Sequence, residues 1–143
     1  MYIAIGADHR GYAQKERIKK SLRDIEWLDV GAHNKKRSDY PVFGSAVAES
    51  VRDGDAQLGI LLCGSGVGMA VVANRYRGIY AGVAWNNEVA THARRQDNVN
   101  ILVIPSDFVS DTRAVAMVRA WLGTKFAGKR YADRLRMIDR AAR

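Results

Sequence analysis

Five short apolar runs alternate with amphipathic stretches along the chain, and this alternation restricts the fold more than any other feature. Between the first two runs, Ile18, Leu22 and Ile25 recur at helical spacing, whereas the runs themselves are strand-like. Strands that alternate with helices form βαβ units, in which a parallel sheet is covered on both faces. We therefore predict an α/β fold, a three-layer sandwich whose five-stranded parallel sheet uses residues 2–7, 26–32, 58–63, 80–85 and 100–106.

The stretches between and after these runs predict the helices. Helical spacing of apolar residues is clearest in 11–25, 42–53 and 111–123. The last stretch, 129–143, predicts a basic C-terminal helix with an apolar side formed by Tyr131, Leu135, Ile138 and Ala142. Because no linker, repeat or low-complexity segment interrupts the pattern, we expect residues 1–143 to form a single domain.

Composition restricts the setting of the protein. No apolar run approaches the roughly 18 residues of a membrane span, and the run after Met1 does not resemble a signal peptide. The lone Cys63 cannot form an internal disulfide. These features predict a protein of the reducing cytoplasm with no membrane partner.

The net charge of +8 raises the question of nucleic acid. Much of the positive charge lies in the C-terminal segment, and the chain has no zinc-finger spacing, no aromatic RNA-binding signature and no clear helix-turn-helix. We therefore expect an anionic metabolite as the ligand, with nucleic acid ranked well below it.

The residues that directly follow each strand are the candidates for a site. Ligands of an open parallel sheet bind beyond the carboxyl ends of its strands. The candidate residues are Asp8-His9 after the first strand, Ser38-Asp39-Tyr40-Pro41 in the loop after the second, the loop from Cys63 to Gly68, Asn86-Asn87 after the fourth, and Ser106-Asp107 after the fifth.

The glycine-rich loop in "LLCGSGVGMAVVANR" predicts an anion-binding nest. Gly64, Gly66 and Gly68 allow successive backbone N–H groups to turn towards one point at the start of a helix. A dinucleotide fingerprint would need glycine at Met69, and the Gly-Lys-Ser/Thr ending of a P-loop is absent. What remains is an anion hole with the Cys63 thiol at its mouth.

A thiol in this position suits proton transfer. A helix N-terminus and a basic environment lower a thiol pKa, so we expect Cys63 to favour the thiolate, which can act as a general base or a nucleophile. A base beside an anion hole suits proton abstraction next to a carbonyl, because the hole stabilises the resulting enediolate. The alternative, that Cys63 only packs and the glycines only turn, is equally compatible with this motif.

Two further pairs of residues have both a functional and a purely structural interpretation. Asp8 and His9 are expected to face the same crevice, although an aspartate capping a helix at Gly11 is also common. Arg130 and Arg134 lie four residues apart on one helical face, where a phosphate would join them. The alternative for the arginines is a solvated basic face.

Four segments together resemble the ribose-5-phosphate isomerase B family, which includes galactose- and allose-6-phosphate isomerases. They are "IAIGADHRGY", "SDYP", "LLCGSGVGMAVVANRYRGIYA" and "FAGKRYADR", and the similarity extends from residue 2 to about residue 140. The resemblance implies a Rossmann-like fold and an aldose–ketose isomerase of phosphorylated sugars that works through an enediolate, most directly on ribose 5-phosphate to give ribulose 5-phosphate. It also implies no metal or cofactor, and a homodimer or dimer of dimers in which two subunits build each site.

The resemblance also assigns roles to residues of this chain. It makes Cys63 the base and Ser65, with the loop amides, the group that holds the developing oxyanion. It gives Asp8 contacts to sugar hydroxyls and makes Tyr40 a residue that lines the pocket. The remaining substrate-binding positions are the loop residues Gly64, Gly66, Val67 and Gly68, the phosphate ligands His9, Arg130 and Arg134, and the segment Gln96, Asp97 and Asn98.

The segment at Gln96 departs from the family pattern. The family has a His-Asn pair where this chain has Gln96 and Asp97, and that histidine opens the furanose ring of the substrate. Glutamine does not titrate and cannot transfer this proton. Either His92, one helical turn earlier, takes over, or the substrate is a tetrose 4-phosphate that forms no furanose ring.

Two smaller departures concern charge. Asp107 stands where the family often has a phosphate-assisting arginine, and Arg113 is a candidate to compensate for it. Tyr131 stands where a histidine usually follows the first arginine of the tail pair. Isomerisation of another sugar phosphate, either a tetrose 4-phosphate or a hexose 6-phosphate, and a non-catalytic sugar-phosphate-binding paralogue therefore stay open as alternatives.

Overall fold

The computed structural model describes residues 1–141 and contains one parallel sheet of five strands. The strands are β1 (Tyr2–Ala7), β2 (Glu26–Gly31), β3 (Leu58–Cys63), β4 (Ala81–Val83) and β5 (Ile101–Pro105). Their order across the sheet is β2-β1-β3-β5-β4, with parallel pairing throughout. The predicted three-layer α/β architecture is confirmed.

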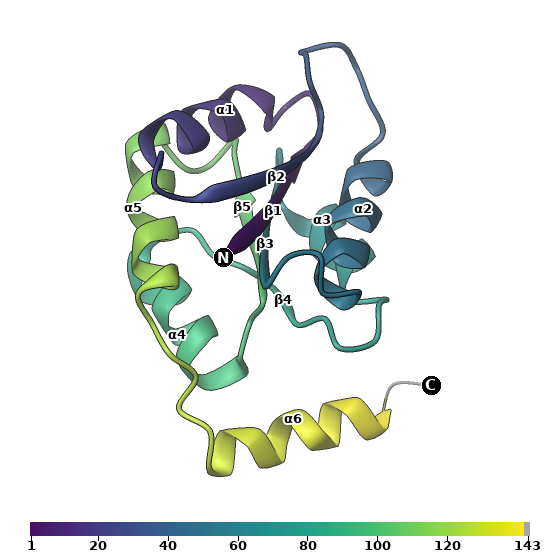
Figure 1. The fold of residues 1–143 in the computed structure, drawn as a ribbon, viewed down its shortest axis with the longest axis vertical. Coiled ribbons are helices and arrows are strands. Elements are labelled where there is room, and N and C mark those ends of the chain that lie inside the picture. Colours follow the sequence, from purple (N-terminus) through teal and green to yellow (C-terminus); the bar gives the residue numbers. More distant parts are fainter. Residues whose placement is uncertain (142–143) are drawn as a thin grey trace.

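Helices cover both faces of the sheet (Figure 1). The helices α1 (Tyr12–Ser21), α4 (Asn87–Asp97) and α5 (Asp111–Leu122) pack on one face, and α2 (Tyr40–Arg52) and α3 (Val67–Ala73) pack on the other. Strand residues alternate between the two layers, so that Ile3 and Ile5 join one core cluster and Ala4 joins the other. Both faces are therefore apolar, which explains why the strands read as continuous apolar runs.

The sixth helix, α6 (Arg130–Ala141), lies outside this sandwich. Figure 1 shows it extending from the end of α5 beneath the rest of the molecule. Its amphipathic pattern is confirmed in part, because Leu135 is buried whereas Ile138 is 54% exposed. The predicted continuation to Arg143, with Ala142 on the apolar side, lies outside the described residues.

Three predicted boundaries differ from the structure. The strand expected at 80–85 is reduced to Ala81–Val83, and the helix expected at 42–53 begins earlier, at Tyr40. The helix expected at 11–25 ends at Ser21, and Ile25 follows in the next turn but still packs against the same core cluster. The apolar spacing thus identified buried positions correctly, but it did not locate the end of the helix.

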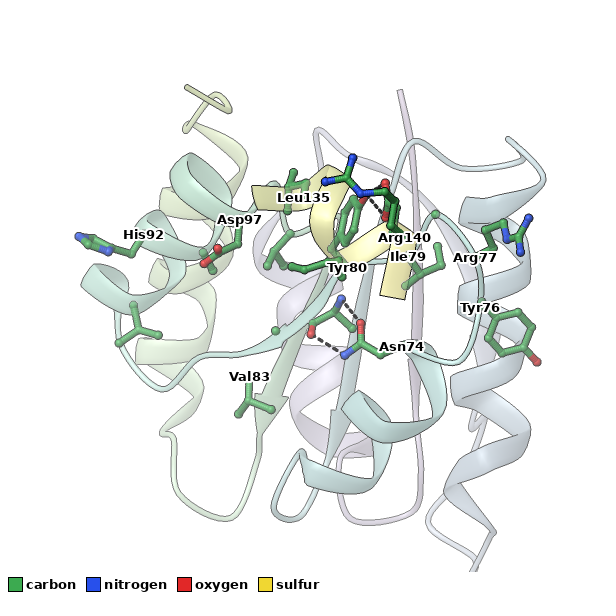
Figure 2. Close-up of a pocket in the computed structure, with 18 residues that line it drawn as sticks. Asn74, Tyr76, Arg77, Ile79, Tyr80, Val83, His92, Asp97, Leu135 and Arg140 are labelled. Carbon is green, nitrogen blue, oxygen red and sulfur yellow. Dashed lines mark hydrogen bonds between the residues drawn. The ribbon is translucent and has the colours of Figure 1, made fainter. Parts of the chain in front are cut away.

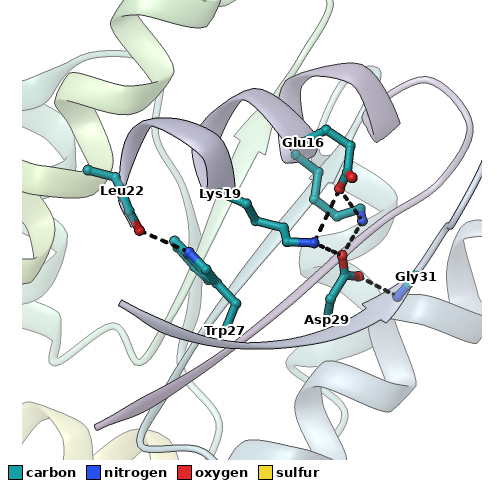
Figure 3. Close-up of polar contacts among 7 residues, drawn as sticks. Glu16, Lys19, Leu22, Trp27, Asp29 and Gly31 are labelled. Carbon is teal, nitrogen blue, oxygen red and sulfur yellow. Dashed lines mark hydrogen bonds and ion pairs between the residues drawn. The ribbon is translucent and has the colours of Figure 1, made fainter. Parts of the chain in front are cut away.

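A network of charged side chains ties α1 to β2 (Figure 3). The Nζ atoms of Lys15 and Lys19 each lie 2.6 Å from Oδ2 of Asp29, and Oδ1 of Asp29 accepts the Gly31 N–H at 2.9 Å. The Lys15 side chain has no exposed surface at all. Burial pushes the pKa of Asp29 upward, but the hydrogen bonds from Lys15 and Lys19 outweigh it and leave the pKa below its usual value.

The strand order places the switch point of the sheet between β1 and β3. The chain runs outward from β1 to β2 and then returns to β3 on the other side of β1, so the strand order reverses between these two neighbours. A crevice forms outside the carboxyl ends of the strands at such a switch point. Asp8 follows β1 at this edge, and Cys63 is the last residue of β3.

Candidate active site

Cys63 occupies the carboxyl end of the central strand β3. The residue is 5% exposed, and its Sγ accepts the N–H of Gly66 at 3.2 Å. Burial raises the pKa of the thiol above its ordinary value, and the negative charge of Asp8 raises it further. The backbone amides of Met69, Gly66 and Ser65 lower it only in part. The prediction of a lowered pKa is therefore wrong for this chain, because desolvation outweighs the helix N-terminus.

The loop after Cys63 turns its amides inward as the glycine pattern predicted. Gly66 has φ +77°, a left-handed conformation that favours glycine, and α3 starts at the next residue. The Oγ of Ser65 accepts the Val67 N–H at 3.2 Å, so the hydroxyl proton of Ser65 is free to point elsewhere. The segment from Cys63 to Gly68 thus forms a concave set of N–H donors next to a thiol.

Asp8 is buried beside this loop and has a structural task as well. Its Oδ1 accepts the backbone N–H of Arg10 at 2.9 Å and that of Gly11 at 3.1 Å. Asp8 therefore closes the turn that leads into α1, but the helix begins at Tyr12 and its N-cap Gly11 has no side-chain cap, so the capping interpretation is not confirmed. The turn engages one carboxylate oxygen only, within the part of the chain that the structure describes. The negative charge of Asp8 is close enough to raise the pKa of the Cys63 thiol.

His9 is held by Ser38, a residue of the "SDYP" loop for which the sequence indicated no specific role. Its backbone N–H donates to Oγ of Ser38 at 3.1 Å, and its Nδ1 accepts the backbone N–H of Ser38 at 3.2 Å. Because Nδ1 is an acceptor here, the ring presents an Nε2–H donor. Ser38 lies 29 residues away in the chain, and only its place in the "SDYP" loop indicated its position.

Tyr40 reaches the glycine loop from the start of α2. A Cβ atom at Gly68 would lie 2.5 Å from the Tyr40 ring, so the ring packs directly on this glycine. Gly68 is therefore required for close approach to the ring, while Gly66 is required for its backbone conformation. We call the residues Asp8, His9, Tyr40 and Cys63–Gly68 the cysteine cradle.

Asp107 forms an ion pair with Arg10, which follows His9. The Nη2 of Arg10 contacts Oδ2 of Asp107, and the pair crosses over Gly64. Arg113 lies in the first turn of α5, where its backbone N–H donates to Oγ of Ser110 at 3.2 Å. The cation that balances Asp107 is thus Arg10, and the expectation for Arg113 is wrong.

The other predicted substrate-binding residues lie elsewhere in the chain. We call Gln96, Asp97, Asn98, Arg130 and Arg134 the distal group. Asp97 ends α4, and the chain then enters β5 at Ile101, which pairs with Gly59 near the amino end of β3. Cys63 lies four residues after Gly59 along β3, so the two residues are about 13 Å apart along the strand. One chain therefore does not bring Gln96 and its neighbours to the cysteine cradle.

The two arginines of the distal group converge on one ring. The guanidinium carbons of Arg130 and Arg134 lie 5.1 Å and 5.9 Å from the centre of the Tyr131 ring, and Nη2 of Arg130 donates to the Tyr131 hydroxyl at 3.2 Å. This hydrogen bond and the positive charge lower the pKa of Tyr131. The predicted shared face is confirmed, and both guanidinium groups are exposed on it.

A hollow of about 950 Å³ separates α6 from the edge strand β4 and from α4 (Figure 2). Figure 2 shows Tyr80, Ile79 and Leu135 on its walls, and the Tyr80 hydroxyl donates to Asp139 at 2.7 Å. Burial and the negative charge of Asp139 raise the pKa of Tyr80 to about 12. His92 is exposed and lines the same hollow as Asp97. The hollow thus belongs with the distal group and not with the cysteine cradle.

Residues 1–141 contain neither a metal-binding cluster nor a membrane-spanning helix. No set of three or more His, Cys, Asp and Glu side chains lies close enough together to hold a metal ion. No helix in this part of the chain is long and apolar enough to cross a membrane.

Comparison with known proteins connects this geometry to a family. Residues 3–138 match the model of the family described as Ribose/Galactose Isomerase. Ribose-5-phosphate isomerase B of Escherichia coli K12 is 38% identical over 138 residues, which are 95% of this chain and 93% of that protein.

Two solved structures resemble the fold over nearly the whole chain. The Clostridium thermocellum ribose-5-phosphate isomerase B superposes with a TM-score of 0.97 at 38% identity, covering 99% of this chain and 97% of that one. The Mycoplasma genitalium ribose-5-phosphate isomerase B, solved with bound ribulose-5-phosphate, gives a TM-score of 0.92 at 35% identity, covering 98% and 95% of the two chains.

Proposed function

Because this chain belongs to the ribose/galactose isomerase family, we propose that it interconverts ribose 5-phosphate and ribulose 5-phosphate at the cysteine cradle. The protein is an aldose–ketose isomerase of phosphorylated sugars. The observation that carries the assignment of the site is the Cys63 thiol, buried at the switch point of the sheet, with the Gly66 N–H 3.2 Å from its Sγ and the Asp8 carboxylate beside it.

Cys63 acts as the base. In the open-chain aldose its thiolate takes the proton from C2, the C2–H electrons form the C1–C2 double bond, and the C1 carbonyl electrons move onto O1. The proton on O2 then passes to O1, the O2–H electrons form the C2 carbonyl, and the electrons of the C1–C2 double bond take the proton from the thiol at C1, which leaves the ketose and restores the thiolate. The raised pKa makes the Cys63 thiolate a stronger base, and it also lowers the fraction of the protein that carries the thiolate at neutral pH.

The glycine loop holds the charge that develops on the substrate oxygen. Its N–H groups already point towards Sγ of Cys63, so they are oriented before the reaction and need no rearrangement. Ser65 adds a hydroxyl donor, because its Oγ accepts from Val67 and leaves its own proton free. On the opposite side of the site, Asp8 holds the sugar hydroxyl groups with Oδ2, the carboxylate oxygen that does not accept the N–H groups of Arg10 and Gly11.

The phosphate end of the substrate is held by His9 through its Nε2–H, together with Arg130 and Arg134. Because one chain keeps these arginines apart from His9, we infer that they come from a second copy of the chain. The exposed apolar residues of α6, Met137 at 61% and Ile138 at 54%, support this inference. Each site then combines the cysteine cradle of one subunit with the distal group of another, in a homodimer or a dimer of dimers.

Ring opening needs a proton-transfer group that Gln96 does not provide. His92 lies one turn earlier on α4 and lines the same hollow as Asp97. We therefore assign the ring-opening proton transfer in the assembled dimer to His92. We expect His92→Ala to slow turnover of ribose 5-phosphate, which is cyclic, and to leave erythrose 4-phosphate unaffected. Equal effects on both substrates would remove His92 from ring opening.

Turnover of ribose 5-phosphate, allose 6-phosphate and erythrose 4-phosphate by the native protein and by Cys63→Ala tests the proposal. Ribose 5-phosphate is expected to be the best substrate, and Cys63→Ala to lower kcat by about 10²–10⁴-fold. Cys63→Ser is the matched control, since it keeps a small polar side chain but lacks a comparable base. Native protein that binds these compounds without converting them would point to a sugar-phosphate-binding protein instead.

With a single cysteine in the chain, we also propose that the enzyme works in the reducing cytoplasm.

A further inference from the structure

An ion pair lies directly over the glycine loop. Arg10 follows β1 and Asp107 follows β5, and Nη2 of Arg10 contacts Oδ2 of Asp107. A Cβ atom at Gly64 would lie 2.8 Å from both Nε of Arg10 and Oδ2 of Asp107. The pair therefore spans the carboxyl ends of β1, β3 and β5 at the mouth of the cysteine cradle.

Both partners are anchored through their backbones to parts of the cradle. The Arg10 N–H donates to Oδ1 of Asp8 at 2.9 Å, and the Asp107 N–H donates to the carbonyl of Gly64 at 3.0 Å. These bonds fix the origin of each side chain relative to Cys63. The position of the pair over Gly64 follows from the fold and not only from the attraction between the two charges.

The guanidinium of Arg10 is available to a ligand. Its side chain is 57% exposed, whereas the Asp107 side chain is 35% exposed. A guanidinium has five N–H donors, and the Nη2 contact to Asp107 leaves the others free for an anion. Asp107 thus restricts the side chain to one position without using all of its donors.

The charges at this mouth show what the pair does. An isolated Asp107 carboxylate would repel a phosphate dianion approaching the nest, so a compensating cation is needed at this position. Arg10 provides it, and His9, the neighbouring residue, presents an Nε2–H donor from the same turn. Arg113, the other candidate, has its backbone in the first turn of α5 and lines a separate surface hollow with Asn86 and Glu88.

We propose that Arg10 is a substrate-binding residue that contacts the phosphate of the sugar, and that Asp107 is the positioning residue that holds it over Gly64. This inference rests on the proposed isomerase function. It adds to the cysteine cradle a cation from the same chain, which acts together with the two arginines that the second copy supplies.

Four proteins test the inference: the native enzyme, Arg10→Gln, the double variant Arg10→Gln/Asp107→Asn, and Arg113→Gln as the matched control. Two quantities are measured for each, the KM and kcat for ribose 5-phosphate and the Kd for inorganic phosphate by calorimetry. Phosphate binding does not require turnover. If the native enzyme binds phosphate but isomerises nothing, the proposed function fails while Arg10 is still tested.

Arg10→Gln is expected to raise both KM and the phosphate Kd by about tenfold or more, with kcat nearly unchanged, because it removes a charged hydrogen bond and uncovers Asp107. The double variant is expected to regain part of this loss, since Asp107 no longer repels the anion. Arg113→Gln is expected to behave like the native enzyme. Unchanged KM and Kd in Arg10→Gln, or an equal increase in Arg113→Gln, would overturn the role of Arg10. A double variant no better than Arg10→Gln would overturn the pairing with Asp107.

Discussion

The cysteine cradle and the distal group differ in how the chain holds them. Three titratable side chains of the cradle accept hydrogen bonds from backbone N–H groups: Asp8 from Gly11, His9 from Ser38, and Cys63 from Gly66. In the distal group, Arg130 and Arg134 are exposed and have Tyr131 as their shared neighbour. The first group is ordered by the fold of one chain, and the second is the group that we propose a second copy of the chain supplies to the site.

This difference separates two kinds of site residue. Residues that follow strands are placed by the sheet, so their geometry is established as soon as the chain folds. Residues on a helix beyond the last strand, such as Arg130 and Arg134, would owe their place in a site to the proposed assembly. Substitutions behind the cradle should therefore cost stability as well as activity, whereas substitutions in the distal group should cost activity alone.

The largest effect on stability is expected from Asp29→Ala. This change removes the carboxylate that lies 2.6 Å from the buried Lys15 and leaves Glu16, at 3.1 Å, as its remaining partner. Removing one member of a buried ion pair costs about 3–5 kcal/mol, and the remaining contact to Glu16 should reduce the cost here. The free energy of unfolding, from denaturant titration, is the measurement. Asp24→Ala, at an exposed aspartate just beyond α1, is the control and should change little. Similar free energies of unfolding for the two variants would show that the network in Figure 3 does not stabilise the fold behind the cradle.

A smaller effect, on binding alone, is expected from Arg134→Ala. Loss of one guanidinium–phosphate contact should raise KM for ribose 5-phosphate by about tenfold. Because Arg134 is exposed, the free energy of unfolding should stay within about 0.5 kcal/mol of the native value. Arg136→Ala, on the same helix, is the control for KM. An Arg134→Ala variant with a lower free energy of unfolding and an unchanged KM would contradict the expectation that changes in the distal group affect activity alone.

The smallest effect concerns pH and Cys63. Because burial raises the pKa of the thiol above its ordinary value, kcat/KM should rise with pH and continue to rise beyond the pH at which a free thiol ionises. The same shift favours the folded state while the thiol is protonated. Its contribution to stability is full below pH 9.0 and is lost as the pH rises through the higher pKa of the folded protein. The difference in unfolding free energy between the native protein and Cys63→Ser, measured against pH, isolates the contribution of the thiol to stability. A kcat/KM that levels off well below pH 9 would contradict the raised pKa of Cys63.

Sequence periodicity predicted the sheet. Strands buried on both faces are continuously apolar, as in "LGILLC", whereas a helix of the same length would be apolar on one face only. The rule for carboxyl ends then placed Asp8 beside Cys63. Contacts between distant segments were beyond such reasoning: Ser38 lies 29 residues from His9, and Asp107 lies 97 residues from Arg10.

The pKa of Cys63 shows why the sequence alone was insufficient for electrostatics. A helix N-terminus can be recognised in the "GSGVG" pattern, and it predicted a lowered pKa. The depth of burial at the end of β3 and the orientation of Asp8 cannot be recognised in this way, and they reverse the sign of the shift.

The most direct test of the account is to mix the inactive variant Cys63→Ala with the weakly binding variant Arg134→Ala, after partial unfolding and refolding so that subunits exchange. If each site combines the cradle of one copy with the distal group of another, a mixed dimer contains one intact site, and an equal mixture should recover about a quarter of the native sites. Arg134→Ala is assayed at a substrate concentration well below its raised KM, so that its own turnover is low. A mixture no more active than the average of its components, with mixed dimers present, would mean that one chain builds the whole site.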